Sequence, residues 1–431
     1  MKTKLRSKMA AVPAGLLLVL TPAVHAQSFP PEIQAGASTI IDYEFDWGRD
    51  GTYCLTCNFG DGNNRLSFTD NDGNVWISHI DVDTGNFVPG DGKEELVDTN
   101  AMPVRTGHNG PEWMGLQSSS ALVYNRFVDN KPQNPSNACV GFGRVVVPGS
   151  WTGGCMPKTN GYSFPFATEN VGDPSPMVSY RDSSPAGTDM YWRLVKQGAP
   201  AHEFLSDSDQ SRLEPHWVAG THKLLLTVPA PPDASGNVYR QIFLYSTTDN
   251  TLEQLTFEPT DKAAAYMWRA PEYNNSFVFF ARVGYTEIDV YRYLPDSSGS
   301  SSWQITKSIQ SIPDYPYIYS PETFVYNGKS WIFFTISSEL VDHTIAASQV
   351  ALTGIEPDVP TFRVLTTDVS GDHGRQDPEY YITANGPYIY YNRYILLAKG
   401  VARSEGVFHV DTGLGAAPPS QTHMYTARRK D

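Results

Sequence analysis

A short element that contains proline recurs along this chain, and each copy stands before an apolar run of the kind that forms buried strands. Five copies carry Glu or His after the proline and then Trp, Tyr or Thr. They occupy residues 110–113, 214–217, 270–273, 320–323 and 377–380, and a degenerate copy occupies residues 173–178. The first prolines of successive copies are 41 to 63 residues apart. Recurrence in this range is typical of solenoids and propellers, in which each repeat buries its faces only against its neighbours.

The runs between these elements have the composition of strands: apolar, with many β-branched and aromatic side chains, and bounded by turn residues. Examples lie at residues 223–228, 276–281 and 330–335. The fullest copy, residues 215–257, contains four such runs, and the hairpin at 65–78 supplies one more unit without proline. The sequence therefore predicts an all-β fold, a seven-bladed β-propeller of four-stranded antiparallel blades, as a single domain over residues 27–431. We expect residues 38–45 to close the ring by pairing with residues 407–410, because closure removes exposed sheet edges.

The stretch RQIFLYSTTDNTLEQLTF, residues 240–257, combines an apolar strand, a polar turn and a second strand ending in Leu-Thr-Phe. This stretch resembles the blade ends of TolB-like propellers. The resemblance extends over residues 213–310, and it implies the propeller architecture without specifying an activity.

The N-terminus has the features of a secretory signal. Four basic side chains within residues 2–8 precede an apolar run that is too short to span a membrane, and Val24-His25-Ala26 forms an A-x-A-like cleavage site. We expect cleavage after Ala26 and a secreted or periplasmic protein. Removing the four basic residues lowers the formal net charge from −14 to −18. This acidity disfavours nucleic acid and anionic membranes as partners, and no later segment is predicted to span a membrane.

The chain contains four cysteines, Cys54, Cys57, Cys139 and Cys155. In an oxidising compartment two disulfides are expected, most simply between the neighbours in sequence, although four cysteines allow three connectivities. A Cys-x-x-Cys redox or zinc role is the alternative. It is disfavoured because no second ligand pair stands at zinc-ribbon spacing.

The recurring glutamate could serve architecture or chemistry. If these elements start inner strands, equivalent positions around the axis are occupied by Glu112, His216, Glu272, Glu322 and Glu379. Four glutamates exceed what catalysis needs, so most are expected to be architectural, with the carboxylate bonded to a neighbouring blade. Chemistry is expected in side chains that the repeat does not share, gathered at one mouth of the propeller. The candidate catalytic residues are His108, His373, Tyr180 and Tyr319. The candidate substrate-binding residues are Asn109, Arg181, Arg193, Arg269, Arg375, Gln376, Trp268 and Glu112.

These residue types suit β-elimination on an acidic glycan: arginine neutralises a uronate carboxylate, histidine removes the C5 proton and tyrosine protonates the leaving oxygen. They resemble the sets used by polysaccharide lyases on propeller scaffolds, so an exported lyase is the first hypothesis.

Two alternatives stay open. One is a non-enzymatic TolB-like scaffold that binds a protein or a glycan, and the other is a glycoside hydrolase with paired carboxylates. The hydrolase candidates are Glu112, Glu272, Glu322, Glu379 and Asp377. The motifs predict no cofactor and no metal site, a structural divalent cation stays open, and the protein is expected to be a monomer.

Overall fold

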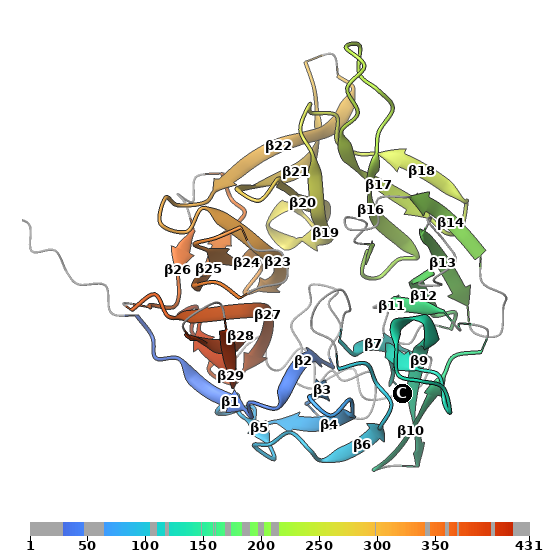
Figure 1. Cartoon of the computed structure of the whole chain (residues 1–431). Coiled ribbons are helices and arrows are strands. Elements are labelled where there is room, and N and C mark those ends of the chain that lie inside the picture. The colour runs from blue at the N-terminus through green and yellow to red at the C-terminus, as the bar shows by residue number, and fades with distance from the viewer. Residues whose placement is uncertain are drawn as a thin grey trace, which may run out of the picture.

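The computed structural model describes residues 29–46, 64–103, 110–116, 120–147, 149–157, 159, 161–168, 174–182, 190–196, 202–207, 215–297, 299–340, 345–357, 362–368, 370–397 and 401–416. Across these residues seven antiparallel sheets stand around a common axis, which is the arrangement of a seven-bladed β-propeller (Figure 1). The predicted fold class is therefore confirmed. The predicted signal peptide, Cys54 and Cys57 lie outside the described residues.

The strands of each blade follow one another from the axis outward. Blade 1 contains β2 (Ile40–Phe45), β3 (Arg65–Asp70) and β4 (Val75–Ile80), with β5 (Phe87–Val88) and β6 (Glu95–Asp98) both paired to β4. Blade 2 contains β7 (Glu112–Gly115), β8 (Ser120–Phe127), β9 (Ala138–Val147) and β10 (Ser150–Cys155). Blade 3 contains β11 (Tyr162–Ala167), β12 (Met177–Asp182), β13 (Met190–Lys196) and β14 (His202–Asp207). Blade 4 contains β15 (His216–Trp217), β16 (Lys223–Pro229), β17 (Arg240–Ser246) and β18 (Thr251–Gln254).

The remaining blades have longer inner strands. Blade 5 contains β19 (Lys262–Ala270), β20 (Ser276–Val283), β21 (Glu287–Pro295) and β22 (Ser301–Gln310). Blade 6 contains β23 (Tyr317–Tyr326), β24 (Lys329–Ser337), β25 (Ser348–Gly354) and β26 (Arg363–Val364). Blade 7 contains β27 (His373–Thr383), β28 (Gly386–Leu397), β29 (Val401–Asp411) and, as its outermost strand, β1 (Ile33–Gly36).

The N-terminal segment closes the ring, but with different residues from those expected. In blade 7, Ile33 of β1 pairs with His409 of β29. The expected closing segment, residues 38–45, is wrong: β2 pairs with β3 and forms the inner strand of blade 1. Three residues, 37–39, connect the two strands, so the chain passes from the outer edge of the last blade directly to the inner edge of the first (Figure 1).

Several inner strands share a bulge that the sequence elements mark. Pairing with the second strand shifts register in β11, β19, β23 and β27, and one residue in each bulge has a positive φ of 42° to 56°. These residues are Phe164, Ala264, Ser320 and Asp377. A β-bulge bends the strand and redirects the side chains that follow it.

The positions of the bulges show that two of the predicted proline elements were assigned to the wrong residues. In blade 3 the element is Phe164-Pro165-Phe166, whereas Pro174 precedes the second strand. In blade 5 the bulge carries Ala265 in place of proline, and Pro271 begins the short helix η2 (Pro271–Tyr273) after the inner strand has ended. With these corrections the equivalent positions from blade 2 to blade 7 are 50 to 57 residues apart, a narrower range than the prolines alone suggested.

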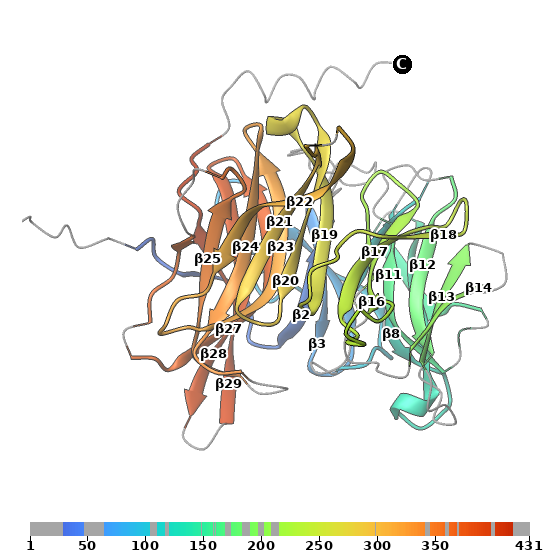
Figure 2. The same ribbon diagram turned by 90° about the horizontal axis from the view of Figure 1, so that it is seen from above.

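The two ends of the propeller carry different connections. Inner strands begin at one end, here called the mouth face, and second strands turn into third strands there too. The N–H of Ile318, near the start of β23, accordingly donates to the carbonyl of Tyr285 in the β20–β21 turn. Figure 2 shows η1 (Pro135–Asn137), in the β8–β9 connection, at the mouth face and η2 at the opposite end.

The hydrophobic core is divided into clusters that lie between neighbouring blades. Trp113 of blade 2 packs with Val75 of blade 1, and Trp268 of blade 5 packs with Ile332 of blade 6. The largest cluster joins blades 6, 7 and 1, where the ring of Phe45 lies 4.8 Å from that of Tyr390. Each blade therefore buries its faces against its neighbours, as the repeat predicted.

A disulfide joins Cys139 and Cys155, in the third and fourth strands of blade 2, with a Cα–Cα distance of 5.7 Å. This confirms one of the two expected disulfides, and it indicates an extracytoplasmic location. Among the described residues, neither of the short helices has the length or apolarity needed to cross a membrane.

Candidate functional site

One side chain from each inner strand contributes to a ring around the axis, which we call the axial belt. In each inner strand, the belt residue is the first residue after the β-bulge or, where there is no bulge, the first residue after the proline that opens the strand. The belt consists of Asp42, Glu112, Phe166, His216, Tyr266, Glu322 and Glu379. All are half-buried except Glu379, which is buried. The chain thus places one chemical group per blade at one level of the axis, and each blade can vary its group without changing the fold.

Blades 3 to 5 supply an aromatic arc to the belt. The ring of Phe166 lies 5.8 Å from that of His216, which stacks on Tyr266 with centroids 4.0 Å apart. His216 Nδ1 lies 3.0 Å from the carbonyl oxygen of Ala265 in the bulge of the next blade. The Tyr266 hydroxyl donates to Glu322 Oε1 at 3.3 Å. Belt residues of four successive blades therefore contact one another in order.

Blades 6, 7, 1 and 2 supply an acidic arc. Asp42 shares a hydrogen bond with the side chain of Asp377, the bulge residue of blade 7. Burial raises the pKa of the Asp42 carboxyl well above its ordinary value, and the charge of Asp377 raises it further. The charges of Glu112 and Glu44 act in the same direction. A hydrogen bond between two carboxyl groups requires a proton on one of them, because an ionised carboxylate can only accept.

Neighbouring groups fix the geometry of this acid pair. The Tyr43 hydroxyl donates to the backbone carbonyl of Asp377 at 3.1 Å. Gly110, at the start of the blade 2 inner strand, lies so close to Asp42 that a Cβ built on it would overlap the carboxylate. The glycine before Pro111 is therefore required by the approach of a neighbouring blade.

The other sequence-predicted residues of the mouth face lie on several blades. His373 and Gln376 are half-buried near the start of β27, and the ring of Tyr319 lies 5.6 Å from that of Tyr285. Tyr180 is fully buried. His108 and Asn109 lie outside the described residues.

The predicted arginines are placed in different surroundings. Arg375 is 1% exposed and forms a two-pronged ion pair with Glu32, so it holds the N-terminal segment against blade 7. Arg181 stacks on Phe164 at 4.0 Å, and burial lowers its pKa to about 10. Among the described residues its Nε has no hydrogen-bond acceptor. Arg193 lies in β13, the strand next to the one that carries Arg181.

Trp268 and Arg269 lie at the end of β19 away from the mouth face. The indole of Trp268 is buried and donates to Ser330 Oγ at 2.9 Å. Arg269 stacks on Phe277 at 4.1 Å and donates to the carbonyl of Asn275. The structure therefore does not bring these two residues together with Tyr319 and His373.

Glu272 shows the architectural role that was expected for the repeated glutamates. It lies in η2, outside the belt, and its carboxylate accepts hydrogen bonds from the backbone N–H and the hydroxyl of Ser330, at 2.7 and 2.9 Å. The expectation that Glu272 occupies a position equivalent to Glu322 is wrong, because Tyr266 takes that position in blade 5. A proline precedes Phe166 and could have identified its belt position from the sequence, whereas no proline precedes Asp42 or Tyr266.

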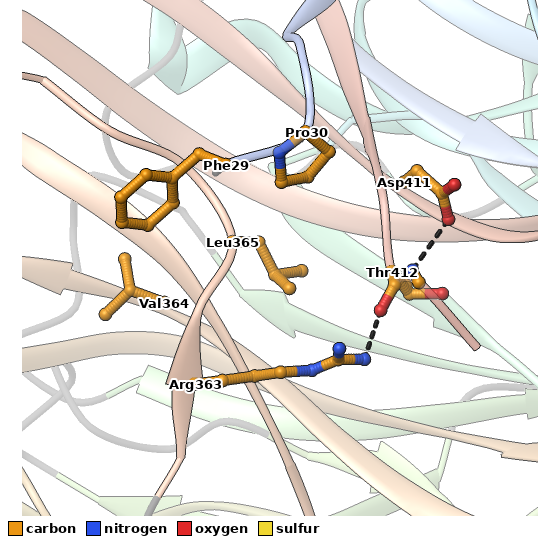
Figure 3. Close-up of a pocket in the computed structure, with 8 residues that line it drawn as sticks. Phe29, Pro30, Arg363, Val364, Leu365, Asp411 and Thr412 are labelled. Carbon is orange, nitrogen blue, oxygen red and sulfur yellow. Dashed lines mark hydrogen bonds between the residues drawn. The ribbon is translucent and has the colours of Figure 1, made fainter. Parts of the chain in front are cut away.

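A cavity of about 300 Å³ lies away from the belt, between the N-terminal segment and the outer parts of blades 6 and 7 (Figure 3). Phe29 and Pro30 lie across this cavity from Arg363, whose guanidinium donates to the carbonyl of Thr412. Burial lowers the pKa of Arg363. None of the predicted site residues lines this cavity.

Comparison with known proteins identifies similarity at the level of structure. No protein-family model matches the chain, and no curated protein sequence matches it. TolB from Acinetobacter baumannii is 14% identical over 81% of this chain and 79% of that chain, with a TM-score of 0.35. Oligogalacturonate lyase from Vibrio parahaemolyticus is 12% identical over 89% of this chain and 94% of that chain, with a TM-score of 0.43. The tricorn protease is 10% identical over 89% of this chain but 35% of that chain, with a TM-score of 0.44. These proteins differ in what they do, and identities this low relate the fold alone.

Proposed function

We propose that this chain is an exported carbohydrate-active protein that binds a glycan at the axial belt and hydrolyses a glycosidic bond there. The observation that carries the proposal is the hydrogen-bonded carboxyl pair of Asp42 and Asp377 beside the carboxylate of Glu112. Glycoside hydrolysis needs one carboxyl group that keeps its proton at working pH and a second that is ionised. The raised pKa of Asp42 supplies the first of these, and Glu112 is a candidate for the second.

The aromatic arc supports a sugar ligand. Phe166, His216 and Tyr266 offer flat faces for the C–H surface of a pyranose ring, and the acidic arc offers acceptors for its hydroxyl groups. The same acidic arc would repel a uronate carboxylate, so a neutral glycan fits the belt better than an acidic one. This is why the hydrolase alternative is preferred to the lyase hypothesis.

In the proposed reaction Asp42 gives its proton to the glycosidic oxygen as the bond from that oxygen to the anomeric carbon breaks. Water attacks the anomeric carbon, and Glu112 takes the proton that this water loses. Asp377 is a positioning residue, because its hydrogen bond keeps the proton on Asp42 until the glycosidic oxygen of the substrate takes the place of Asp377 as acceptor. The products are two sugars, one with a new reducing end.

The test is a panel of neutral and uronate glycans incubated with the mature protein, with new reducing ends and the ultraviolet absorbance of unsaturated products followed together. New reducing ends without that absorbance are expected on a neutral glycan. Asp42→Asn and Glu112→Gln should each lower the rate by about 10²- to 10⁴-fold. Glu272→Gln is the matched control, because it removes a glutamate from the same sequence element outside the belt. Equal rates for the control and both belt variants would refute the proposal.

A lyase acting on an uronate glycan is the second candidate, and Arg181 is the observation that favours it. Its guanidinium lies against Phe164, in the bulge that precedes the aromatic arc, and it could neutralise a substrate carboxylate. Ultraviolet-absorbing products that disappear in Arg181→Gln but persist in Asp42→Asn would decide for this candidate. Saturable glycan binding without products on any glycan would instead favour the scaffold alternative.

A further inference from the structure

We propose that the mouth face of blade 7 binds a divalent transition-metal cation through Asp368, Asp372 and His373. One ligand atom from each of these side chains lies within 4.8 Å of the other two. His373 begins β27, and the two aspartates lie in the connection that leads into this strand from blade 6. The site is separate from the acid pair of the axial belt and uses none of its residues.

The spacing of the three ligand atoms is close to that of a metal site. His373 Nδ1 lies 2.7 Å from Asp372 Oδ1 and 3.4 Å from Asp368 Oδ1. Ligand atoms bound to Zn²⁺ at about 2.1 Å lie roughly 3.0 to 3.4 Å apart in octahedral or tetrahedral arrangements. The 3.4 Å separation lies in this range and the 2.7 Å separation is shorter, so a cation could bind once the Asp372 carboxylate rotates away from Nδ1. One imidazole with two carboxylates favours Zn²⁺ or Mn²⁺ over Mg²⁺, which prefers oxygen alone.

The surroundings of His373 supply an independent indication. Its other ring nitrogen, Nε2, lies 3.5 Å from Glu405 Oε2, and Arg393 Nε donates to the same carboxylate oxygen at 2.8 Å. A histidine that ligates a metal commonly donates its remaining N–H to a carboxylate, which fixes the tautomer and leaves the first nitrogen free to bind. Glu405 is within ion-pair distance of this nitrogen and could accept its N–H after a small approach, and Arg393 holds the carboxylate beside it.

The two aspartates have different degrees of preorganisation. The side chain of Asp368 is 2% exposed, and it accepts hydrogen bonds from the backbone N–H groups of His373 and Gly371. Asp372 is 44% exposed, so it can move to meet an incoming ion. A cation bound here would order the connection into β27, four residues before Asp377 of the acid pair.

The experiment measures Zn²⁺ and Mn²⁺ binding to the mature full chain by titration calorimetry, in excess Ca²⁺ to suppress loose binding by surface carboxylates. One tight site is expected. His373→Gln and Asp372→Asn should each weaken it by at least about tenfold, and Glu405→Gln by about 10- to 100-fold. His79→Gln is the matched control, because within the described part of the chain His79 forms an ion pair with Glu94 and with no second carboxylate, and it should leave the affinity unchanged.

A competing arrangement is a protonated His373 that forms ion pairs with the surrounding carboxylates and binds no metal. It predicts that the wild type takes up Zn²⁺ and Mn²⁺ no more tightly than Asp372→Asn does, and this result would overturn the proposal. Retained tight binding in His373→Gln would overturn it as well. Circular dichroism of each variant shows that it is folded, and the exposed Asp372 provides a variant that should fold whatever the effect of changing His373. Because these readouts do not use turnover, they are independent of the proposed hydrolase activity.

Discussion

Acid should weaken the interface between blades 7 and 1 through His409. This histidine is 1% exposed in β29, with its ring 4.7 Å from Tyr388 and 5.1 Å from Tyr390. Its Nε2 lies 3.2 Å from Asn86 Oδ1 of blade 1, so this nitrogen carries the proton. Among the described residues Nδ1 has no partner. Protonation would therefore create a buried charge and an N–H group without an acceptor.

The size of the effect follows from the pKa of His409, which burial lowers from 6.5 to about 4. Between these values the unfolded chain binds a proton that the folded chain does not, so stability falls as the pH falls. The stability contributed by neutral His409 is present above pH 6.5 and is lost on the way to pH 4. Each pKa unit corresponds to about 1.4 kcal/mol, so the loss from pH 7 to pH 4 is about 3 kcal/mol.

The assay is urea unfolding of the wild type and His409→Gln at several pH values between 7 and 4. Glutamine can still donate to Asn86, but it does not titrate. All other groups titrate in both proteins, so the difference between their free energies of unfolding isolates His409. The wild type should lose about 3 kcal/mol more than the variant over this range. Parallel pH dependences would refute the reasoning, and they would mean that the ring is protonated without penalty in the folded protein.

Three further changes should alter stability, each measured by urea unfolding at constant ionic strength. Glu32→Ala leaves the buried guanidinium of Arg375 without its carboxylate and should cost about 3 kcal/mol or more, so a change within experimental error would contradict the role given to this ion pair. Replacing Cys139 and Cys155 by serine opens a loop of 16 residues and should cost about 3 kcal/mol, an effect that vanishes if the comparison is with reduced wild type. Asp42→Asn should raise the unfolding midpoint at pH 8 and change it little at pH 4, because a carboxyl with a raised folded pKa loses stability as pH rises above its unfolded pKa; the opposite pH trend would argue against the shared proton.

The propeller could be predicted from the sequence because strand patterning and repeat length are local properties. The strand runs of blades 4 to 7 appear in the structure where the apolar residues indicated them. Placement within each blade was less certain in blades 3 and 5. Pro174 and Pro271 belong to proline elements like that of Pro321, yet Pro174 precedes a second strand and Pro271 begins a helical turn.

The belt could be predicted only in part. Glu322 and Glu379 follow prolines and were recognised as equivalent, whereas Asp42 and Tyr266 follow Ile41 and Ala265, which carry no such signal. The equivalence depends on a backbone bulge, and alanine can occupy that bulge as well as proline. The acid pair depends in addition on the approach of blades 7 and 1, whose strands are distant in the chain. A pattern along the sequence does not contain that contact.

The pairing of β1 with β29 has a consequence for the order of folding. Gln34 donates to the carbonyl of Glu405, 371 residues further along the chain, so β1 gains its partners only after β29 has been synthesised. Until then the outer edge of β29 is an unpaired strand edge, which other chains could use for association. A chain that crosses a membrane before folding would meet this requirement, because β1 and β29 then reach the same compartment before the ring closes.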